Sequence, residues 1–362
     1  MPSLQEIVDV SITLESSALT VRGFNSLMLA GKSASFVGGA PTPFEVGDVR
    51  PYTTLSEVQA DAAIAADGEI MKMAQVAFAQ SPSMSVLYIA YAKDTTSDPD
   101  EQIETSDLLD IMATNNEWFG YCSEFNDPLS IKRQNDALGS TKYGFYLIED
   151  APDAIPAGLD GLSDYSSLWH TKSTDTAGGK YVNVAVASAL LALKPGSYTA
   201  AFKSLQSVEL STYSPAEEKL LRPTDGTPAH RINQYSSVSG RGITWEGVTA
   251  NVSVKGFIDT YIGKIYLQAR LEEDIFAQLA SVGKVPYTNA GAQIITTAVL
   301  TRLNESVRDG YLKAVPAPVV APIQLDQIPA TSVSARVLPD VRFTAETAGA
   351  IHTVKINGTI SV

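Results

Sequence analysis

The chain has 362 residues, of which 44% are hydrophobic and 18% charged, and a formal net charge of −14. This length exceeds what one hydrophobic core usually fills, so we expect two or more globular domains and no extensive disorder. The negative charge repels nucleic-acid phosphates, which argues against a nucleic-acid partner. No apolar run approaches the roughly 20 residues of a membrane span, so we expect no membrane insertion.

Two further features of the composition bear on compartment and chemistry. The first residues lack the basic and apolar regions of a signal peptide, which predicts a protein made and kept in the cytoplasm. The one cysteine, Cys122, lies in an apolar run, so we expect a buried, inert thiol and no internal disulfide.

The start of the chain alternates strictly between apolar and polar residues. A period of two is the pattern of a β-strand with one apolar face. The apolar positions of this predicted strand are Val8, Val10, Ile12 and Leu14.

The next segment predicts an α/β domain. Residues 27–47 indicate a short strand and a loop, and residues 56–66 and 69–80 indicate helices. Predicted strands then alternate with predicted helices, a pattern typical of parallel strands joined by crossover helices. The strands are residues 86–92, 118–123, 143–148 and 167–171, and the helices are residues 105–115 and 129–138. For residues 181–193 both a helix and a strand fit.

The second half has a different pattern. A short helix at 215–221 precedes predicted strands at 243–245 and 248–255. Residues 259–280 and 290–309 predict two long amphipathic helices, which we expect to pack against the sheet. A proline-stiffened connector follows, and then two short strand patterns, marked by Val333, Ala335 and Val337 and by Val341 and Phe343.

The last ten residues, 353–362, repeat the alternation of the first segment. Their apolar face consists of Val354, Ile356, Ile360 and Val362. A hairpin turn at Asn357-Gly358 would mix apolar and polar residues on each face, so a continuous strand is favoured. A lone strand leaves its backbone groups unpaired. Each terminal strand can therefore pair within its own domain or with a neighbouring copy, and the pattern alone leaves both open.

A search for catalytic apparatus finds no complete motif. Gly240, Gly242 and Gly247 lack the spacing of a dinucleotide-binding fingerprint. The histidines stand far apart, at positions 170, 230 and 352, which argues against a zinc site. We therefore expect no catalytic residue, cofactor or metal. An α/β enzyme or small-molecule-binding protein with a scattered carboxylate site remains the alternative.

The C-terminal part resembles the contractile tail sheath proteins of myophages. The resemblance rests on Pro339-Asp340-Val341-Arg342-Phe343, Ala348-Gly349-Ala350-Ile351-His352 and Val354-Lys355-Ile356-Asn357-Gly358, with support from Gly240-Arg241-Gly242-Ile243-Thr244-Trp245 and the two long helices. It is strongest over residues 230–362, extends to the first 50, and is weak between. A tail tube subunit, the other array-forming candidate, would be smaller and nearly all β.

The resemblance implies a mixed α/β (α+β), multi-domain subunit that polymerises around an inner tube. Its expected parts are a strand arm at 1–22, an outward-facing α/β domain at 23–200, a core at 201–345 and a second arm at 346–362. In sheaths both arms leave their own subunit and complete a sheet on neighbours. The expected recipient sheet here contains Val333, Ala335, Val337, Val341 and Phe343. The implied partners are further copies, the inner tail tube protein, and baseplate and tail terminator proteins. The implied location is the virion tail, assembled in the host cytoplasm.

Overall fold

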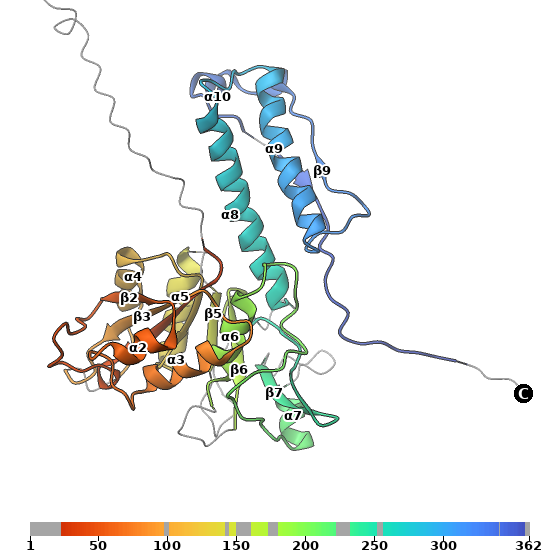
Figure 1. Cartoon of the computed structure of the whole chain (residues 1–362). Helices are drawn as coiled ribbons and strands as arrows, with labels where there is room; N and C mark the ends of the chain where they lie inside the picture. The colour runs from red at the N-terminus through yellow and green to blue at the C-terminus, as the bar shows by residue number, and fades with distance from the viewer. Residues whose placement is uncertain are drawn as a thin grey trace, which may run out of the picture.

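The computed structural model describes residues 23–97, 101–141, 145–149, 161–172, 180–221, 232–251, 256–339 and 341–358. An α/β body, a projecting helical hairpin and an extended C-terminal tail follow one another along the chain (Figure 1). The mixed α/β class predicted from the sequence is confirmed.

The body is built on one eight-stranded sheet. Its spatial order is β2-β3-β1-β4-β5-β6-β7-β8, with parallel pairing from β3 to β7 and an antiparallel strand at each end. The strands are β1 (Ser26–Lys32), β2 (Val49–Tyr52), β3 (Val86–Lys93), β4 (Gly120–Ser123), β5 (Phe145–Glu149), β6 (Ser166–His170), β7 (Ile232–Val238) and β8 (Arg241–Thr244).

Helices cover both faces of this sheet, because its central strands are apolar on both sides. Leu27 and Leu29 of β1 belong to the same buried cluster as α3 and α6. Met28 and Ala30 belong to the cluster that contains α4 and α5. The helical elements of the body are η1 (Ser33–Ser35), α2 (Leu55–Ala60), α3 (Glu69–Ala79), α4 (Thr105–Thr114), α5 (Pro128–Thr141), α6 (Val182–Leu191) and α7 (Pro215–Leu221).

Most predicted elements of the body are present, with several differences. Residues 182–191 form a helix that is buried on nearly every side, which resolves the helix or strand ambiguity there. The helix predicted at 56–66 ends at Ala60, where the Asp61 carboxylate accepts a hydrogen bond from Ala63 N. Strands β2 and β7 were not predicted, and the described residues 248–251 of the strand predicted at 248–255 form only an isolated bridge at Val248. Because β7 and β8 continue the sheet, the expected domain boundary at residue 200 falls inside the body.

The hairpin consists of α8 (Ile258–Ser281) and α9 (Asn289–Arg308). The buried residues of α8 all lie between Ile258 and Ala269, and its second half extends away from the body beside α9 (Figure 1). The prediction that both helices pack against the sheet is therefore wrong for α9 and for the second half of α8, whereas the first half of α8 belongs to the buried cluster of the body. The two helices meet each other around the buried side chains of Leu267, Val299 and Leu303.

The chain returns along the hairpin through short elements: β9 (Val319–Val320), η2 (Leu325–Gln327), α10 (Ala330–Ser334) and β10 (Phe343–Thr344). The strand predicted around Val333, Ala335 and Val337 is wrong. Val333 lies in α10, Ala335 is its helical C-cap, and Val337 N donates back to Ser332 O in the following turn.

Candidate self-assembly interface

A two-stranded ribbon lies along the side of the hairpin. Phe343 and Thr344 pair antiparallel with Val320 and Val319. The pairing resumes nearer the body, with a bridge between residues 312 and 347 and a hydrogen bond from Ala348 N to the carbonyl of residue 311. Strands β9 and β10 form a sheet of two in the described part of the chain, so each keeps one edge without a strand partner there.

One face of the ribbon completes the hairpin core, and the other is exposed. Leu312, Val320 and Val341 pack with the cluster of Val299 and Leu303. On the opposite side, 57% of Val319 is accessible, and Phe343, which pairs with Val320, is itself 40% accessible. The ribbon is therefore anchored on the hairpin while it still presents apolar side chains and open backbone edges.

A groove of about 570 Å³ runs between α9 and β9. Its apolar walls include Ala292 and Leu300 from the helix and Val319 and Val320 from the strand. Leu300 is itself exposed. The groove thus offers apolar surface beside a strand.

The C-terminal tail exposes apolar side chains of the kind that pack into such a groove. Residues 353–358 have no secondary structure, are exposed, and form no hydrogen bond with the rest of the described chain. Val354 is 72% and Ile356 87% accessible, although both belong to the apolar face predicted for this segment. The other predicted arm residues, Val8, Val10, Ile12, Leu14, Ile360 and Val362, lie outside the described residues.

The five predicted recipient residues fall in two places. Val341 and Phe343 belong to the ribbon or its approach, next to the open edges. Val333, Ala335 and Val337 lie instead at the far end of the hairpin, where the Tyr287 hydroxyl donates to Val337 O at 3.0 Å. The strand Val319–Val320 was missed, although two adjacent valines between Pro318 and Pro322 are a strand-like signal in that connector.

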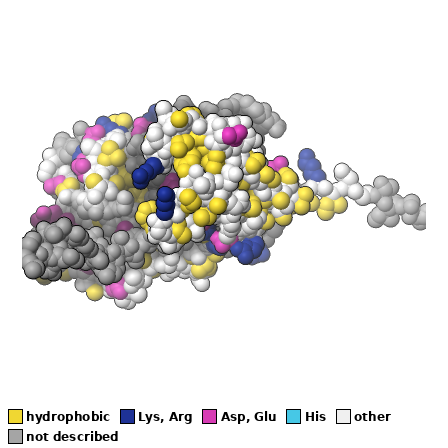
Figure 2. All heavy atoms as spheres, turned by 90° about the horizontal axis from the view of Figure 1, so that it is seen from above, with side chains coloured by type: hydrophobic (Ala, Val, Ile, Leu, Met, Phe, Trp, Pro, Cys, Tyr) yellow, Lys and Arg dark blue, Asp and Glu magenta, His cyan; other side chains and the backbone are white. Residues whose placement is uncertain are grey.

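The far end of the hairpin is a second exposed apolar surface. Figure 2, which looks onto the molecule from that end, shows hydrophobic side chains gathered beside Lys and Arg. The exposed apolar residues of these segments include Leu279, Val282, Val333 and Val337. Contiguous apolar surface of this kind is typical of protein contact sites.

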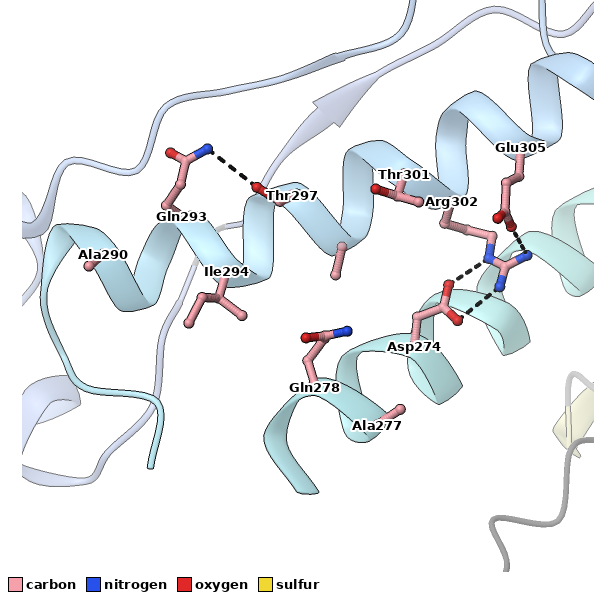
Figure 3. Close-up of a pocket in the computed structure, with 11 residues that line it drawn as sticks. Asp274, Ala277, Gln278, Ala290, Gln293, Ile294, Thr297, Thr301, Arg302 and Glu305 are labelled. Atoms are coloured by element: carbon pink, nitrogen blue, oxygen red, sulfur yellow. Dashed lines mark hydrogen bonds and ion pairs between the residues drawn. The ribbon is translucent and has the colours of Figure 1, made fainter. Parts of the chain in front are cut away.

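Between the two helices, polar side chains fix the angle of the hairpin. Arg302 of α9 donates to both carboxylate oxygens of Asp274 in α8, at 2.6 and 2.8 Å, and also pairs with Glu305 (Figure 3). Hydrogen bonding to Asp274 raises the pKa of Arg302 above its ordinary value. A shallow groove of about 470 Å³ borders these residues and continues past Gln278 and Ile294. The bidentate pair holds the helices in register.

The carboxyl ends of β1 and β4 are where a doubly wound sheet would hold a ligand. Glu124 lies there, and burial raises the pKa of its carboxyl group to about 7. Its oxygens accept hydrogen bonds from the Ser35 hydroxyl and, at 2.9 Å, from Lys32 N. The carboxyl group therefore ties β1, η1 and β4 together within the fold.

Among the residues that the structure describes, no three His, Cys, Asp or Glu side chains come together as metal ligands. None of the described helices has the length and hydrophobicity that a membrane crossing requires. The side chain of Cys122 is fully buried, as expected.

The described chain thus combines an exposed tail with a ribbon that has open strand edges. Residues 258–315, which span α8, α9 and the start of the ribbon segment, match the family described as E217 tail sheath protein gp31-like, C-terminal domain. No curated protein matches the chain.

Solved structures with the same fold come from contractile assemblies. A chain of the anti-feeding prophage (AFP) baseplate is 15% identical with a TM-score of 0.67, and covers 97% of this chain and 99% of its own. The contracted AFP helical sheath gives 13% identity and a TM-score of 0.65, with 100% and 99% covered. The contracted sheath complex of PVC, an extracellular contractile injection system, gives 11% and 0.65, with 98% and 97% covered. The chain has the fold of contractile sheath proteins, and the resemblance predicted from its sequence is confirmed.

Proposed function

We propose that this chain is the repeating subunit of a contractile phage-type tail sheath, and that its terminal strands pair with neighbouring copies. The observation that carries the proposal is that one molecule presents both a strand-like tail without a partner strand in the described chain and a ribbon with open strand edges. Residues 353–358 expose Val354 and Ile356, the apolar side chains of the predicted strand, and the ribbon of β9 and β10 has edges that a strand can extend. Each element supplies what the other lacks.

Strand addition is strong enough to hold such an array. Each ladder hydrogen bond contributes about 0.5 to 1.5 kcal/mol net, so an arm of about eight residues contributes on the order of 5 to 10 kcal/mol before ordering costs. In this proposal Val354 and Ile356 of one copy pack against the apolar wall of another, beside Val319 and Leu300. Val341 and Phe343 take part from the second strand of the ribbon.

A tail donated to a neighbour makes a head-to-tail contact. Such contacts continue indefinitely unless a rotation closes them, and so generate helical arrays. The N-terminal segment, with Val8, Val10, Ile12 and Leu14, supplies a second link of the same kind. Two links per subunit produce a mesh that stays connected while the contacts between bodies rearrange.

The remaining partners follow from a sheath role. The array surrounds an inner tail tube, meets baseplate and terminator proteins at its ends, and forms part of a virion tail assembled in host cytoplasm. The α/β body, which continues past residue 200 through β7 and β8, faces outward. The subunit does not act as an enzyme, so the energy of contraction is stored at assembly in a metastable extended array that a baseplate signal releases.

The test is the assembly state of the full chain and of a chain that lacks residues 353–362. Electron microscopy of the full chain should show long hollow tubes. The shortened chain should give discrete particles with an unchanged circular dichroism spectrum and thermal midpoint, because residues 353–358 add no contact to the subunit core. Tubes from the shortened chain, or its cooperative unfolding, would contradict the strand-arm assignment.

A further inference from the structure

The C-terminal tail is fastened to the body at one side chain, just before it becomes exposed. His352 Nε2 lies 3.0 Å from Thr199 Oγ1. The imidazole ring also packs edge-on against Phe257, with centroids 5.1 Å apart, and against Phe202 at 5.7 Å. After His352, residues 353–358 form no hydrogen bond with the rest of the described chain.

The residues that receive His352 come from the body and from the base of the hairpin. Thr199 and Phe202 lie in the connection between α6 and α7, and Phe257 is the N-cap of α8. Phe202 has a φ of +61°, a left-handed conformation that is unfavourable for a residue with a Cβ, and it is 43% exposed. This backbone, held by a hydrogen bond from Phe202 N to Thr244 O at 2.8 Å, keeps an aromatic ring at the surface where His352 packs. We call Thr199, Phe202 and Phe257 the His352 socket.

The turn before His352 makes few contacts that fix its position. The last ribbon hydrogen bond is made by Ala348 N. Gly349 then adopts a φ of +63°, and Ile351 is 82% exposed. Beneath the turn lies a cavity of about 480 Å³, lined in part by Tyr198, whose buried hydroxyl has no hydrogen-bond partner within the described chain. The direction of the tail therefore depends on the contacts of His352.

We propose that His352 is the positioning residue that sets where and in which direction the C-terminal arm leaves its subunit, so that residues 353–362 meet the strand edge of a second copy of this chain. The inference rests on the proposed function. Without the contacts of His352 the arm samples many directions. Its apparent affinity for the second copy then falls in proportion to the fraction of molecules in which the arm points toward the strand edge. Loss of the contacts with the His352 socket should therefore weaken assembly by about tenfold, although the arm itself is still present.

The first experiment measures the anchor in dilute, monomeric full-length chain. Spin labels on Lys264→Cys in α8 and Lys355→Cys in the tail report one distance distribution by pulsed electron paramagnetic resonance, because both lysines are exposed and Cys122 is buried. The distribution should be narrow in the parent and broad with His352→Ala. An equally broad distribution in the parent would overturn the anchor.

Variants on both sides of the contact test the same anchor. Phe202→Ala, which removes a wall of the socket, should broaden the distribution as His352→Ala does. His352→Phe retains the edge-on packing and should recover part of the narrow distribution. Thr353→Ala, at the next and exposed position, serves as the matched control and should change nothing. A distribution unaffected by Phe202→Ala would overturn the socket.

The second experiment measures the critical concentration for polymer formation by sedimentation. His352→Ala and Phe202→Ala should each raise it about tenfold, His352→Phe by less, and Thr353→Ala not at all. Polymers that form equally well with His352→Ala would overturn the positioning role alone. A parent chain that forms no polymer at any concentration would instead contradict the sheath function, while its distance distribution still tests the anchor.

Discussion

Replacement of Glu124 by glutamine should change how stability depends on pH. Burial raises the pKa of this carboxyl group from 4.5 to about 7 in the folded chain. Between pH 4.5 and about 7, the Glu124 carboxyl group is mostly ionised in the unfolded chain and mostly protonated in the folded chain. The free energy of unfolding therefore falls as the pH rises from about 4.5 to 7, and becomes level above the folded pKa. At about 1.4 kcal/mol per pH unit, the carboxyl group removes about 3 kcal/mol of stability over this interval.

The Glu124→Gln variant isolates this effect because glutamine does not titrate. Its one carbonyl oxygen can still accept from Lys32 N, whereas its amide nitrogen replaces the oxygen that accepts from the Ser35 hydroxyl, and this lost hydrogen bond lowers stability by about 1 kcal/mol equally at every pH. The informative quantity is therefore the difference in slope. Relative to the variant, the parent should lose about 3 kcal/mol between pH 4.5 and 7.5.

Urea unfolding of dilute protein, followed by tryptophan fluorescence, provides the assay, since Trp118 and Trp169 are buried. Glu45→Gln, in an exposed loop position, corrects for the general effect of removing one negative charge. Parallel free-energy curves for the parent and Glu124→Gln across this pH range would refute the reasoning.

Three further substitutions test the interface and the hairpin. Ile356→Asp should abolish polymers in sedimentation without lowering the thermal midpoint, because this side chain is 87% exposed in the subunit, whereas Lys355→Ala on the opposite face should assemble normally. Gly263→Ala should lower the thermal midpoint, since a Cβ would lie 2.2 Å from the ring of Tyr311. Leu303→Ala should lower the free energy of unfolding of the hairpin by about 2 to 5 kcal/mol, measured by hydrogen exchange in α9, because Leu303 is fully buried.

Each of these predictions has a matched control variant. Gly283→Ala meets nothing within 4 Å and should leave the thermal midpoint unchanged, so an equal effect at Gly263 and Gly283 would contradict the close-approach argument. Thr301 lies on α9 beside the shallow groove, and Thr301→Ala should leave the α9 amides as protected as in the parent. Unchanged protection with Leu303→Ala would argue against a cooperative hairpin core.

Local sequence patterns predicted most helices and strands of the body but missed some of them. Helices α3 and α4 were recognised because their apolar residues follow the helical period, and strands β1 and β3 because each contains a short apolar run. Strand β7 was missed because it buries polar residues: Asn233, for example, donates from its side chain to Leu168 O and Val248 O. A buried amide with internal partners leaves no apolar alternation in the sequence.

The helices of the hairpin show the other limit of sequence patterns. Their bounds were predicted to within two residues, yet their partner was not, since an apolar stripe requires burial without specifying what covers it. The alternation around Val333 was too short to decide a strand, and residues 330–334 form a helical turn after Pro329. The sequence pattern of the tail predicts a strand. In the proposed function this strand pairs with another molecule, so it stays a prediction for the single chain.

The hairpin also acts as a lever. The buried contacts between α8 and the body end at Ala269, so residues 270–281 project beyond them. This free part of the helix spans about 18 Å, and a tilt of about 20° at Ala269 displaces the far end by about 6 Å. That displacement exceeds the spacing of about 4.8 Å between adjacent strands. A tilt of this size can thus exchange contacts at the tip while those at Ala269 hardly move.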